Sequence, residues 1–168
     1  MDGEATPDRR AGTGQIMTKL NRRRALALML ATTLAACGRR EPEVSRALYP
    51  GETPRLRRLI TSYAAHYRVP PSLVHRVVQR ESDYNPVARN GPYYGLMQIH
   101  PQTARTMGHR GPARDLLDAE TNLRFAVKYL RGAWLVADGD PDEAVGWYAR
   151  GYYYEAKRKG LLEATGLR

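Results

Sequence analysis

Cysteine is nearly absent from this sequence, which has 168 residues and a single thiol at Cys37. One thiol cannot form a disulfide within the chain, so no internal cross-link stabilises the fold. Long apolar runs are also missing. The run ALALMLATTLAA at residues 25–36 is shorter than the roughly 20 residues that a membrane-spanning helix needs. The mean hydropathy of −0.58 excludes a protein with several membrane spans, and the length suits one domain with a core.

Phenylalanine is scarce and tyrosine is abundant, with 1 Phe and 2 Trp against 11 Tyr. Tyrosine combines a flat apolar face with a hydroxyl group, which suits sugar rings, protein interfaces and bases equally, so the excess indicates a contact surface without identifying the ligand. The formal net charge of +10 favours an anionic partner. Because the basic residues are scattered along the expected helices and mixed with acids, we interpret the charge as diffuse and expect no nucleic-acid partner.

The first 36 residues have the organisation of an export signal. A cationic stretch, KLNRRR at residues 19–24, precedes the apolar run, which ends in LAAC at residues 34–37. Small residues before a cysteine resemble the bacterial lipobox, in which the cysteine is lipidated after cleavage. We therefore predict a signal peptide at residues 1–36, for which a start at Met17 gives the more usual length, and a lipidated tether at residues 37–53.

This reading places the mature chain in the periplasm, held by lipid at Cys37 to a bacterial membrane, for which we expect the outer membrane. A plain cleaved signal peptide with an incidental cysteine is one alternative. A twin-arginine export signal at Arg23-Arg24 is another. Each of these routes takes the chain out of the cytoplasm, which again argues against nucleic acid as a partner.

Residues 54–168 have the pattern of one helical domain. Thr53-Pro54 provides a hydroxyl cap followed by proline in the first turn, and apolar residues recur after it at helical spacing. We expect further helices from Pro71, over Pro101 to Met107, around residues 123–134, and from Pro141 through Tyr148 after an Asp140 cap. No convincing strand alternation is present. The predicted class is all-α, with at most a small β-hairpin at residues 91–99.

Glu81 continues an apolar stripe on the helix expected from Pro71. At 100° per residue it lies about 20° from Val74 and about 40° from Val77 around the helix axis. A carboxyl group withdrawn from water has a raised pKa, which a general acid needs in order to hold its proton at pH 7. The alternative is that the helix ends at Arg80 and that Glu81 faces solvent or pairs with an arginine.

The segment after Glu81 contains the residues of a sharp reversal. Asn85-Pro86 is expected to end the helix, and Asn90-Gly91-Pro92 and Gly95 allow tight backbone turns. Folding back would bring two tyrosines, a methionine and an amide, at Tyr93, Tyr94, Met97 and Gln98, close to the acid. A concave wall of aromatic and amide groups beside one carboxyl suits a sugar ligand.

Several separate motifs resemble the catalytic core of the lytic transglycosylases, whose domain is similar to goose-type lysozyme. The matching residues are Glu81-Ser82, Asn85-Pro86, Ala88, Gly95-Leu96-Met97-Gln98-Ile99, Pro101, Thr103-Ala104, Asn122, Tyr129-Leu130, Gly139-Asp140, Tyr148 and Gly151. The resemblance covers about residues 56–151. It implies a goose-lysozyme-like helical domain with a substrate cleft, and an enzyme that acts as a carbon-oxygen lyase on peptidoglycan.

By that resemblance Glu81 is the catalytic acid and base, and Tyr148 lies over it and hydrogen-bonds toward it. The residues implied to bind substrate are Ser82, Tyr94, Gly95, Leu96, Met97, Gln98 and Tyr148. The family usually carries Tyr-Asn-Ala-Gly where this chain has Tyr148-Ala149-Arg150-Gly151. The amide is therefore missing and Arg150 adds a bulky charge. The tyrosine run at residues 152–154 is a candidate for rebuilding that wall.

Only one good carboxylate is available for the chemistry. Ordinary glycosidases hold two carboxyl groups ~5 Å or ~6.5–9.5 Å apart. Asp83 would point about 160° away from Glu81 on a continuing helix, and Asp115 and Asp118 lie in a loop whose position the sequence does not define. The resemblance implies that Glu81 protonates the β-1,4 oxygen between N-acetylmuramic acid and N-acetylglucosamine. It then takes the proton of the muramic C6 hydroxyl, which closes a 1,6-anhydro ring.

Two other functions stay open on the sequence alone. A muramidase would hydrolyse the same bond with a second carboxylate, and a non-enzymatic wall-binding lipoprotein would keep the fold without activity. No metal or cofactor is expected, because the four histidines, His66, His75, His100 and His109, are too dispersed to suggest a metal site. The expected partners are peptidoglycan strands and the membrane, with the protein as a monomer.

Overall fold

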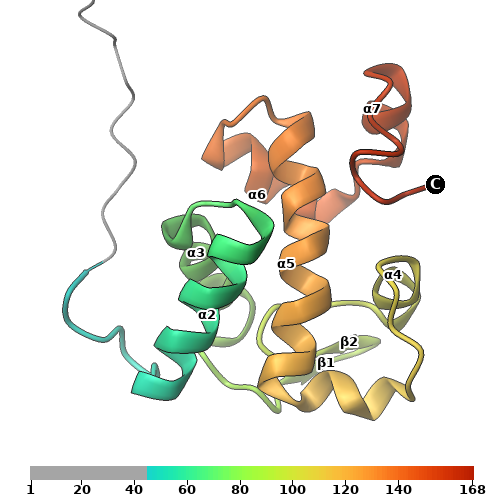
Figure 1. Ribbon diagram of the computed structural model, residues 1–168. Helices are drawn as coiled ribbons and strands as arrows, with labels where there is room; N and C mark the ends of the chain where they lie inside the picture. The colour runs from blue at the N-terminus through green and yellow to red at the C-terminus, as the bar shows by residue number, and fades with distance from the viewer. Residues whose placement is uncertain (1–44) are drawn as a thin grey trace, which may run out of the picture. The chain divides into compact units, whose positions relative to one another are not determined.

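The computed structural model describes residues 45–168 (Figure 1). The predicted signal peptide and the lipid site at Cys37 lie outside the described residues. Within residues 45–168, no helix combines the length and the apolar character needed to cross a membrane.

Short helices and one tiny sheet make up the described chain. The elements are α2 (Pro54–Tyr67), α3 (Pro71–Ser82), β1 (Arg89–Asn90), β2 (Tyr93–Tyr94), α4 (Pro101–Thr106), the 3-10 helix η1 (Ala113–Leu117), α5 (Ala119–Val136), α6 (Pro141–Arg150) and α7 (Tyr153–Arg158). The two strands pair antiparallel, with Asn90 opposite Tyr93. The predicted helical class with a small β-hairpin is confirmed, whereas η1 and α7 were not predicted.

Side-chain caps explain where three of the helices begin. The hydroxyl of Thr53 accepts the N–H of Leu56, as its position before Pro54 predicts. Asp140 accepts the N–H groups of residues 142 and 143 at the start of α6. Asp118 caps α5 in the same way through the N–H of Thr121. Each cap satisfies backbone donors that the first turn of a helix leaves free.

Helix α5 is the centre of the domain. It contacts α2, α4, η1 and α6, and Figure 1 shows it running between the α2–α3 pair and α4. Its inward residues Leu123, Ala126 and Leu130 are fully buried, as are Ile60 of α2 and Val77 of α3. Burying an aliphatic side chain of this size stabilises a fold by about 1.5–3 kcal/mol. The apolar stripe of α3 is therefore anchored, and the end of that helix is held in a defined place.

Helix α3 ends three residues before the predicted break at Asn85-Pro86. Ser82 is its last residue, and Asp83 and Tyr84 both adopt left-handed backbone angles, with φ of 47° and 64°. Such angles favour glycine, but here the Tyr84 ring is buried at 2% exposure and holds the turn. The chain therefore reverses immediately after Ser82, which leaves the Glu81 carboxyl group in the last turn of the helix.

The residues just before α2 pack onto the domain. The carboxylate of Glu52 accepts hydrogen bonds from Arg57, and the Arg57 guanidinium also donates to the carbonyl oxygens of Ser45 and Ala47. The ring of Tyr49 stacks on Tyr84 with centroids 6.0 Å apart. The end of the predicted tether is thus in contact with the turn that follows α3.

Candidate active site

Glu81 lies in the last turn of α3, and its side chain is 23% exposed. This partial burial raises the pKa of the carboxyl group above its usual value, while the nearby positive charge of Arg80 opposes the shift. The two side chains approach at 3.5 Å between the Arg80 Nε and a Glu81 oxygen. Because the burial effect is the larger one, Glu81 holds its proton to a higher pH than a free glutamate does.

Ser82 joins the end of α3 to the loop at residues 95–99. Its hydroxyl donates to the carbonyl oxygen of Leu96 at 2.8 Å and lies 3.3 Å from that of Val78. The predicted substrate residue therefore uses its hydroxyl for a bond within the protein. It fixes the loop, and the residues that the loop carries, beside Glu81.

Asn122 of α5 holds the same loop through its side-chain hydrogen bonds. This fully buried amide accepts the N–H of Met97 at 3.0 Å and donates to the carbonyl oxygens of Tyr94 at 2.7 Å and Leu116 at 2.8 Å. Gly95 has a φ of 74°, and a side chain there would overlap the Asn122 amide. The loop can therefore approach α5 closely only because residue 95 is glycine.

Gln98 adopts a left-handed backbone angle, with a φ of 46°. Its side-chain amide donates to the carbonyl oxygens of Ala88 and Gly95, at 3.1 Å and 2.9 Å, so it also holds the loop. Its Oε1 is buried and has no partner among residues 45–168. Strained backbone of this kind costs roughly 1–3 kcal/mol and persists where the surrounding bonds determine it.

Tyr148 of α6 closes the clamp from the other side. Its hydroxyl donates to the carbonyl oxygen of Met97 at 2.8 Å, which corrects the expectation of a hydrogen bond toward Glu81. The pKa of Tyr148 is well above its ordinary value because the ring is buried and because the negative charge of Glu81 acts on it. Met97 is thus held at its N–H by Asn122 and at its carbonyl by Tyr148, with Glu81 near the tyrosine.

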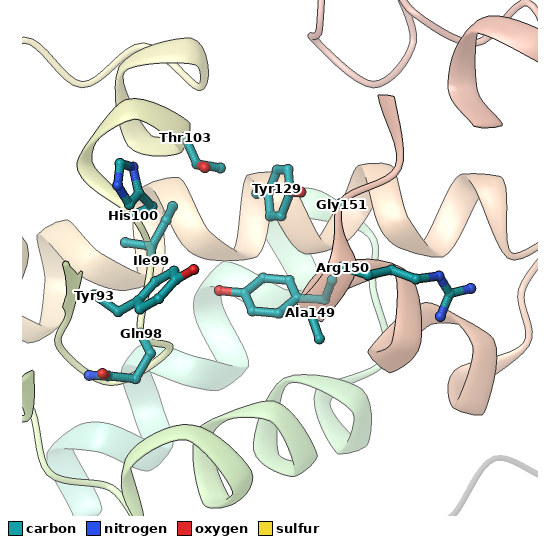
Figure 2. Close-up of a pocket in the computed structure, with 10 residues that line it drawn as sticks. Tyr93, Gln98, Ile99, His100, Thr103, Tyr129, Ala149, Arg150 and Gly151 are labelled. Carbon is teal, nitrogen blue, oxygen red and sulfur yellow. The ribbon is translucent and has the colours of Figure 1, made fainter. Parts of the chain in front are cut away.

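A pocket of about 250 Å³ opens beside this clamp (Figure 2). One wall comes from the hairpin, the loop and α4, and it consists of Tyr93, Gln98, Ile99, His100 and Thr103. The facing wall comes from α5 and α6, and it consists of Tyr129, Tyr148, Ala149, Arg150 and Gly151. The volume is just below the ~300–1,000 Å³ of small-molecule pockets, which suits one sugar ring better than a long ligand.

The structure brings together only part of the predicted substrate-binding set. Gln98 and Tyr148 line the pocket, whereas Leu96 and Met97 are fully buried in the core. Tyr94 does not line it, because its ring packs under the guanidinium of Arg89 and its hydroxyl accepts a hydrogen bond from that group. Glu81 is not a lining residue either, but its charge acts on Tyr148, which lines the pocket.

Eight of the ten lining residues were not among the predicted site residues. They are Tyr93, Ile99, His100, Thr103, Tyr129, Ala149, Arg150 and Gly151. Burial raises the pKa of Tyr129 to about 12, so its hydroxyl remains a hydrogen-bond donor. For Tyr93, the sequence feature that could have indicated this was the pair of tyrosines in the hairpin, because neighbouring residues of a strand point to opposite faces.

The departures at residues 149 and 150 leave the pocket open on the α6 side. Ala149 is exposed at its rim, and Figure 2 shows the Arg150 side chain running away from the pocket. The Arg150 guanidinium lies over the Trp147 ring at 3.8 Å from its centroid. The wall is not rebuilt by the tyrosine run, since Tyr152 is buried in the core and Tyr154 is 84% exposed on α7.

Other acids have separate places in the described structure. Asp118 caps α5, and the Asp115 carboxylate lies against Gly111. Asp83 is exposed in the turn after α3. No acid of residues 45–168 lines the pocket or acts electrostatically on the pKa of Glu81. The described residues also contain no group of three or more His, Cys, Asp or Glu placed to hold a metal ion.

Comparison with known proteins agrees with this geometry. The family model described as the transglycosylase SLT domain matches residues 58–161, which include α3, the clamped loop and the pocket. No solved structure matches the chain significantly. The family match spans more than half of the sequence and confirms the resemblance, together with a lysozyme-like helical fold and peptidoglycan as the family's substrate. The chain belongs to the transglycosylase SLT domain family.

Proposed function

We propose that this protein is a lytic transglycosylase in which Glu81 alone acts as acid and base. It cleaves the β-1,4 bond between N-acetylmuramic acid and N-acetylglucosamine without consuming water. The observation that carries the proposal is the isolation of Glu81. Its carboxyl group is partly buried with a raised pKa, and no second acid of residues 45–168 lines the adjacent pocket.

Proton accounting shows why one carboxyl group suffices. Protonated Glu81 gives its proton to the glycosidic oxygen, and the bond from that oxygen to C1 of the muramic sugar breaks. The resulting carboxylate stabilises the positive charge that develops at C1. It then takes the proton of the C6 hydroxyl as the C6 oxygen bonds to C1. The products are a 1,6-anhydromuramic end and a free 4-hydroxyl group, and Glu81 is protonated again.

The raised pKa of Glu81 serves the first step. A free glutamate, with a pKa of about 4.3, is almost fully ionised at pH 7, so it rarely has a proton to give. Burial increases the protonated fraction. The hydrogen bonds that hold Met97 from two sides keep the loop beside the acid in one place. Fixed positioning of this kind lowers the entropy cost of reaching the transition state.

Digestion of purified peptidoglycan followed by mass spectrometry tests the proposal. The full chain should release muropeptides with 1,6-anhydro ends, and Glu81→Gln should reduce their rate of release by at least about a thousandfold, because an amide can neither give nor take the proton. Glu163→Gln, which changes an exposed acid outside the pocket, is the matched control and should cleave like the unchanged chain.

Products with reducing ends would contradict the transglycosylase mechanism and indicate hydrolysis. Undiminished cleavage by Glu81→Gln would contradict the role of the acid. If the unchanged chain bound peptidoglycan and released nothing, a binding protein that has lost activity would be the remaining interpretation.

We also propose that the protein is exported to the periplasm and anchored by lipid at Cys37. The support is the sequence of residues 19–37 alone, a cationic stretch and an apolar run that ends at a cysteine. Labelling bacteria that express the chain with a radioactive fatty acid should mark the protein. Cys37→Ser should abolish the label, and a label that persisted in this variant would contradict the assignment.

A further inference from the structure

We infer that residues 45–52, which we call the strap, hold the end of α3 in place, and that Tyr49, Gly51 and Glu52 thereby position Glu81. The strap belongs to the predicted tether and lies outside residues 58–161, which match the family model. None of its residues lines the pocket. The inference rests on the proposed role of Glu81 as acid and base, and it gives the three strap residues no part in proton transfer.

The buried carboxylate of Glu52 fixes the strap to α2. Its side chain has no exposed surface, and it accepts hydrogen bonds from the Arg57 guanidinium and from the N–H of Tyr49, the latter at 2.9 Å. The same guanidinium donates to the carbonyl oxygens of Ser45 at 2.7 Å and Ala47 at 3.0 Å. A carboxylate withdrawn from water is stable only where its charge and lone pairs are satisfied. This pairing therefore holds both ends of the strap against α2.

Tyr49 covers the turn that follows α3. Its ring stacks on the Tyr84 ring with centroids 6.0 Å apart and tilts against the His75 ring at 5.1 Å. The Tyr84 hydroxyl lies 2.8 Å from Nδ1 of His75, and the two residues are 2% and 1% exposed. Tyr84 has a left-handed backbone angle, and such strain persists only where the surrounding packing determines it. Tyr49 supplies part of that packing.

Gly51 brings the strap backbone against the turn itself. A Cβ atom at this position would lie 2.6 Å from the carbonyl oxygen of Asp83, which is closer than van der Waals contact allows. Asp83 is the C-terminal cap of α3, two residues after Glu81, and its N–H donates to the carbonyl oxygen of Gln79 at 3.2 Å. Displacing Asp83 therefore loosens the helical turn that carries Glu81.

The last turn of a helix frays unless the residues beyond it hold it. Fraying here would expose the Glu81 carboxyl group to water, lower its pKa toward the usual value and move it away from the scissile bond. The charged and titratable groups that act on Glu81 are Arg80 of the same helix and Tyr148 of α6, and neither belongs to the strap. The pocket walls come from other segments, so loss of the strap should impair the placement of the acid more than glycan binding.

Two variants of the full-length chain test this inference. Tyr49→Ala removes the ring over the turn, and Gly51→Ala pushes the strap and the turn apart without removing a side chain. In peptidoglycan digestion each should lower kcat about tenfold and leave KM within about twofold of the unchanged chain. The alkaline limb of the activity profile should move to lower pH, because the group that must be protonated has a lower pKa.

A measurement that needs no activity accompanies the kinetics. NMR of chains labelled in their glutamate carboxyl carbons gives the pKa of Glu81 directly, with its resonance assigned by its loss in Glu81→Gln. This pKa should be lower in Tyr49→Ala and in Gly51→Ala than in the unchanged chain, because the carboxyl group becomes more hydrated. Circular dichroism at the assay temperature shows that each variant is folded, and Gly51→Ala decides the question if Tyr49→Ala unfolds.

Matched controls separate positioning from general stability. Tyr49→Phe keeps the stacked ring and should restore both the kcat and the pKa of Glu81. Gly160→Ala introduces an alanine at a φ of 68°, close to the 78° of Gly51, but its Cβ atom would meet no atom within 4 Å. It carries the same backbone strain without touching the turn, so kcat and the pKa should stay those of the unchanged chain.

The outcomes distinguish this inference from the proposed function. Unchanged kcat and Glu81 pKa in Tyr49→Ala and Gly51→Ala would overturn the role of the strap, even if the unchanged chain released anhydro products. Equal losses in Gly160→Ala would overturn it as well, since they would indicate a general loss of stability. If the pKa of Glu81 fell as expected while the unchanged chain released reducing ends or nothing, the strap would stand as a positioning element and the proposed reaction would fall.

Discussion

Replacing Asn122 with alanine should be among the most damaging single changes in this domain. The side chain is fully buried and makes three hydrogen bonds, to the Met97 N–H and to the carbonyl oxygens of Tyr94 and Leu116. Alanine removes the amide and leaves the Met97 N–H and the Leu116 carbonyl oxygen without a partner. The Tyr94 carbonyl oxygen, in contrast, still accepts the N–H of Ile99 at 3.1 Å. The surrounding core is closed to water, since Leu96, Met97 and Leu123 are fully buried.

The expected loss of stability follows from the number of backbone groups that lose their only hydrogen-bond partner. A buried backbone group that loses its only side-chain partner costs about 1–3 kcal/mol. Two groups at the low end of that range lower the free energy of unfolding by about 2 kcal/mol. For a domain of this size the corresponding decrease in Tm is about 8 °C. Because Asn122 positions the loop beside Glu81, peptidoglycan cleavage should fall at temperatures where the chain is still folded.

Urea denaturation followed by circular dichroism measures this change directly. Asn122→Ala should lower the midpoint of unfolding while leaving the m-value unchanged, and Asn90→Ala, an exposed asparagine of β1, should have an effect below about 0.5 kcal/mol. A loss of less than 1 kcal/mol for Asn122→Ala would refute the view that this amide determines the loop's position.

Two further predictions concern stability. Gly132→Ala in α5 should lower the free energy of unfolding by about 1–3 kcal/mol in the same urea assay, because the added methyl group would overlap the buried Tyr152 ring. Thermal unfolding should show Tm falling as the pH drops below about 6.5 and again below about 4.3, the unfolded pKa values of histidine and glutamate. Burial lowers the pKa of His75, so protonation favours its unfolded form. Burial alone would raise the pKa of Glu52, but the Arg57 side chain, the Tyr49 backbone and nearby positive charges together lower it, so Glu52 also resists protonation when folded. His75→Gln should remove only the upper step, and a flat Tm over this range would contradict the assignment.

The helices were predictable wherever a cap and a periodic apolar stripe occur together. Thr53 and Asp140 mark the starts of α2 and α6 as expected. The end of α3 was placed too late because the usual stop signal, a glycine, is replaced there by Asp83 in a left-handed conformation. The packing of Tyr84 offsets the energetic cost of that backbone angle. Packing between distant segments cannot be predicted from the local sequence. The short helix α7 was missed for the same reason, since its preceding Tyr152 is drawn into the core.

The location of the site could be predicted from the sequence, but which side chains face the pocket could not. Tyr93 and Tyr94 are neighbours in a strand, so their side chains point to opposite faces, and the sequence does not say which ring faces the pocket. The pairing of Asn90 with Tyr93 across a two-residue turn decides it, turning Tyr93 to the pocket and Tyr94 to Arg89. The sequence likewise did not show that the hydroxyl of Tyr148 donates to the carbonyl oxygen of Met97, because that contact joins segments 51 residues apart.

A single carboxyl group that must first give and then take a proton needs to be partly buried and partly exposed to solvent. If Glu81 were fully buried, the carboxylate formed after the first step would be strongly disfavoured, and protonation of the glycosidic oxygen would be impeded. If it were fully exposed, little of it would be protonated at neutral pH. The structure combines partial burial, which raises the pKa, with the charge of Arg80, which stabilises the carboxylate. Arg80→Gln should therefore raise the pKa of Glu81 further, shifting the alkaline limb of the activity profile to higher pH while lowering the maximal rate, because the carboxylate intermediate loses its nearest positive charge.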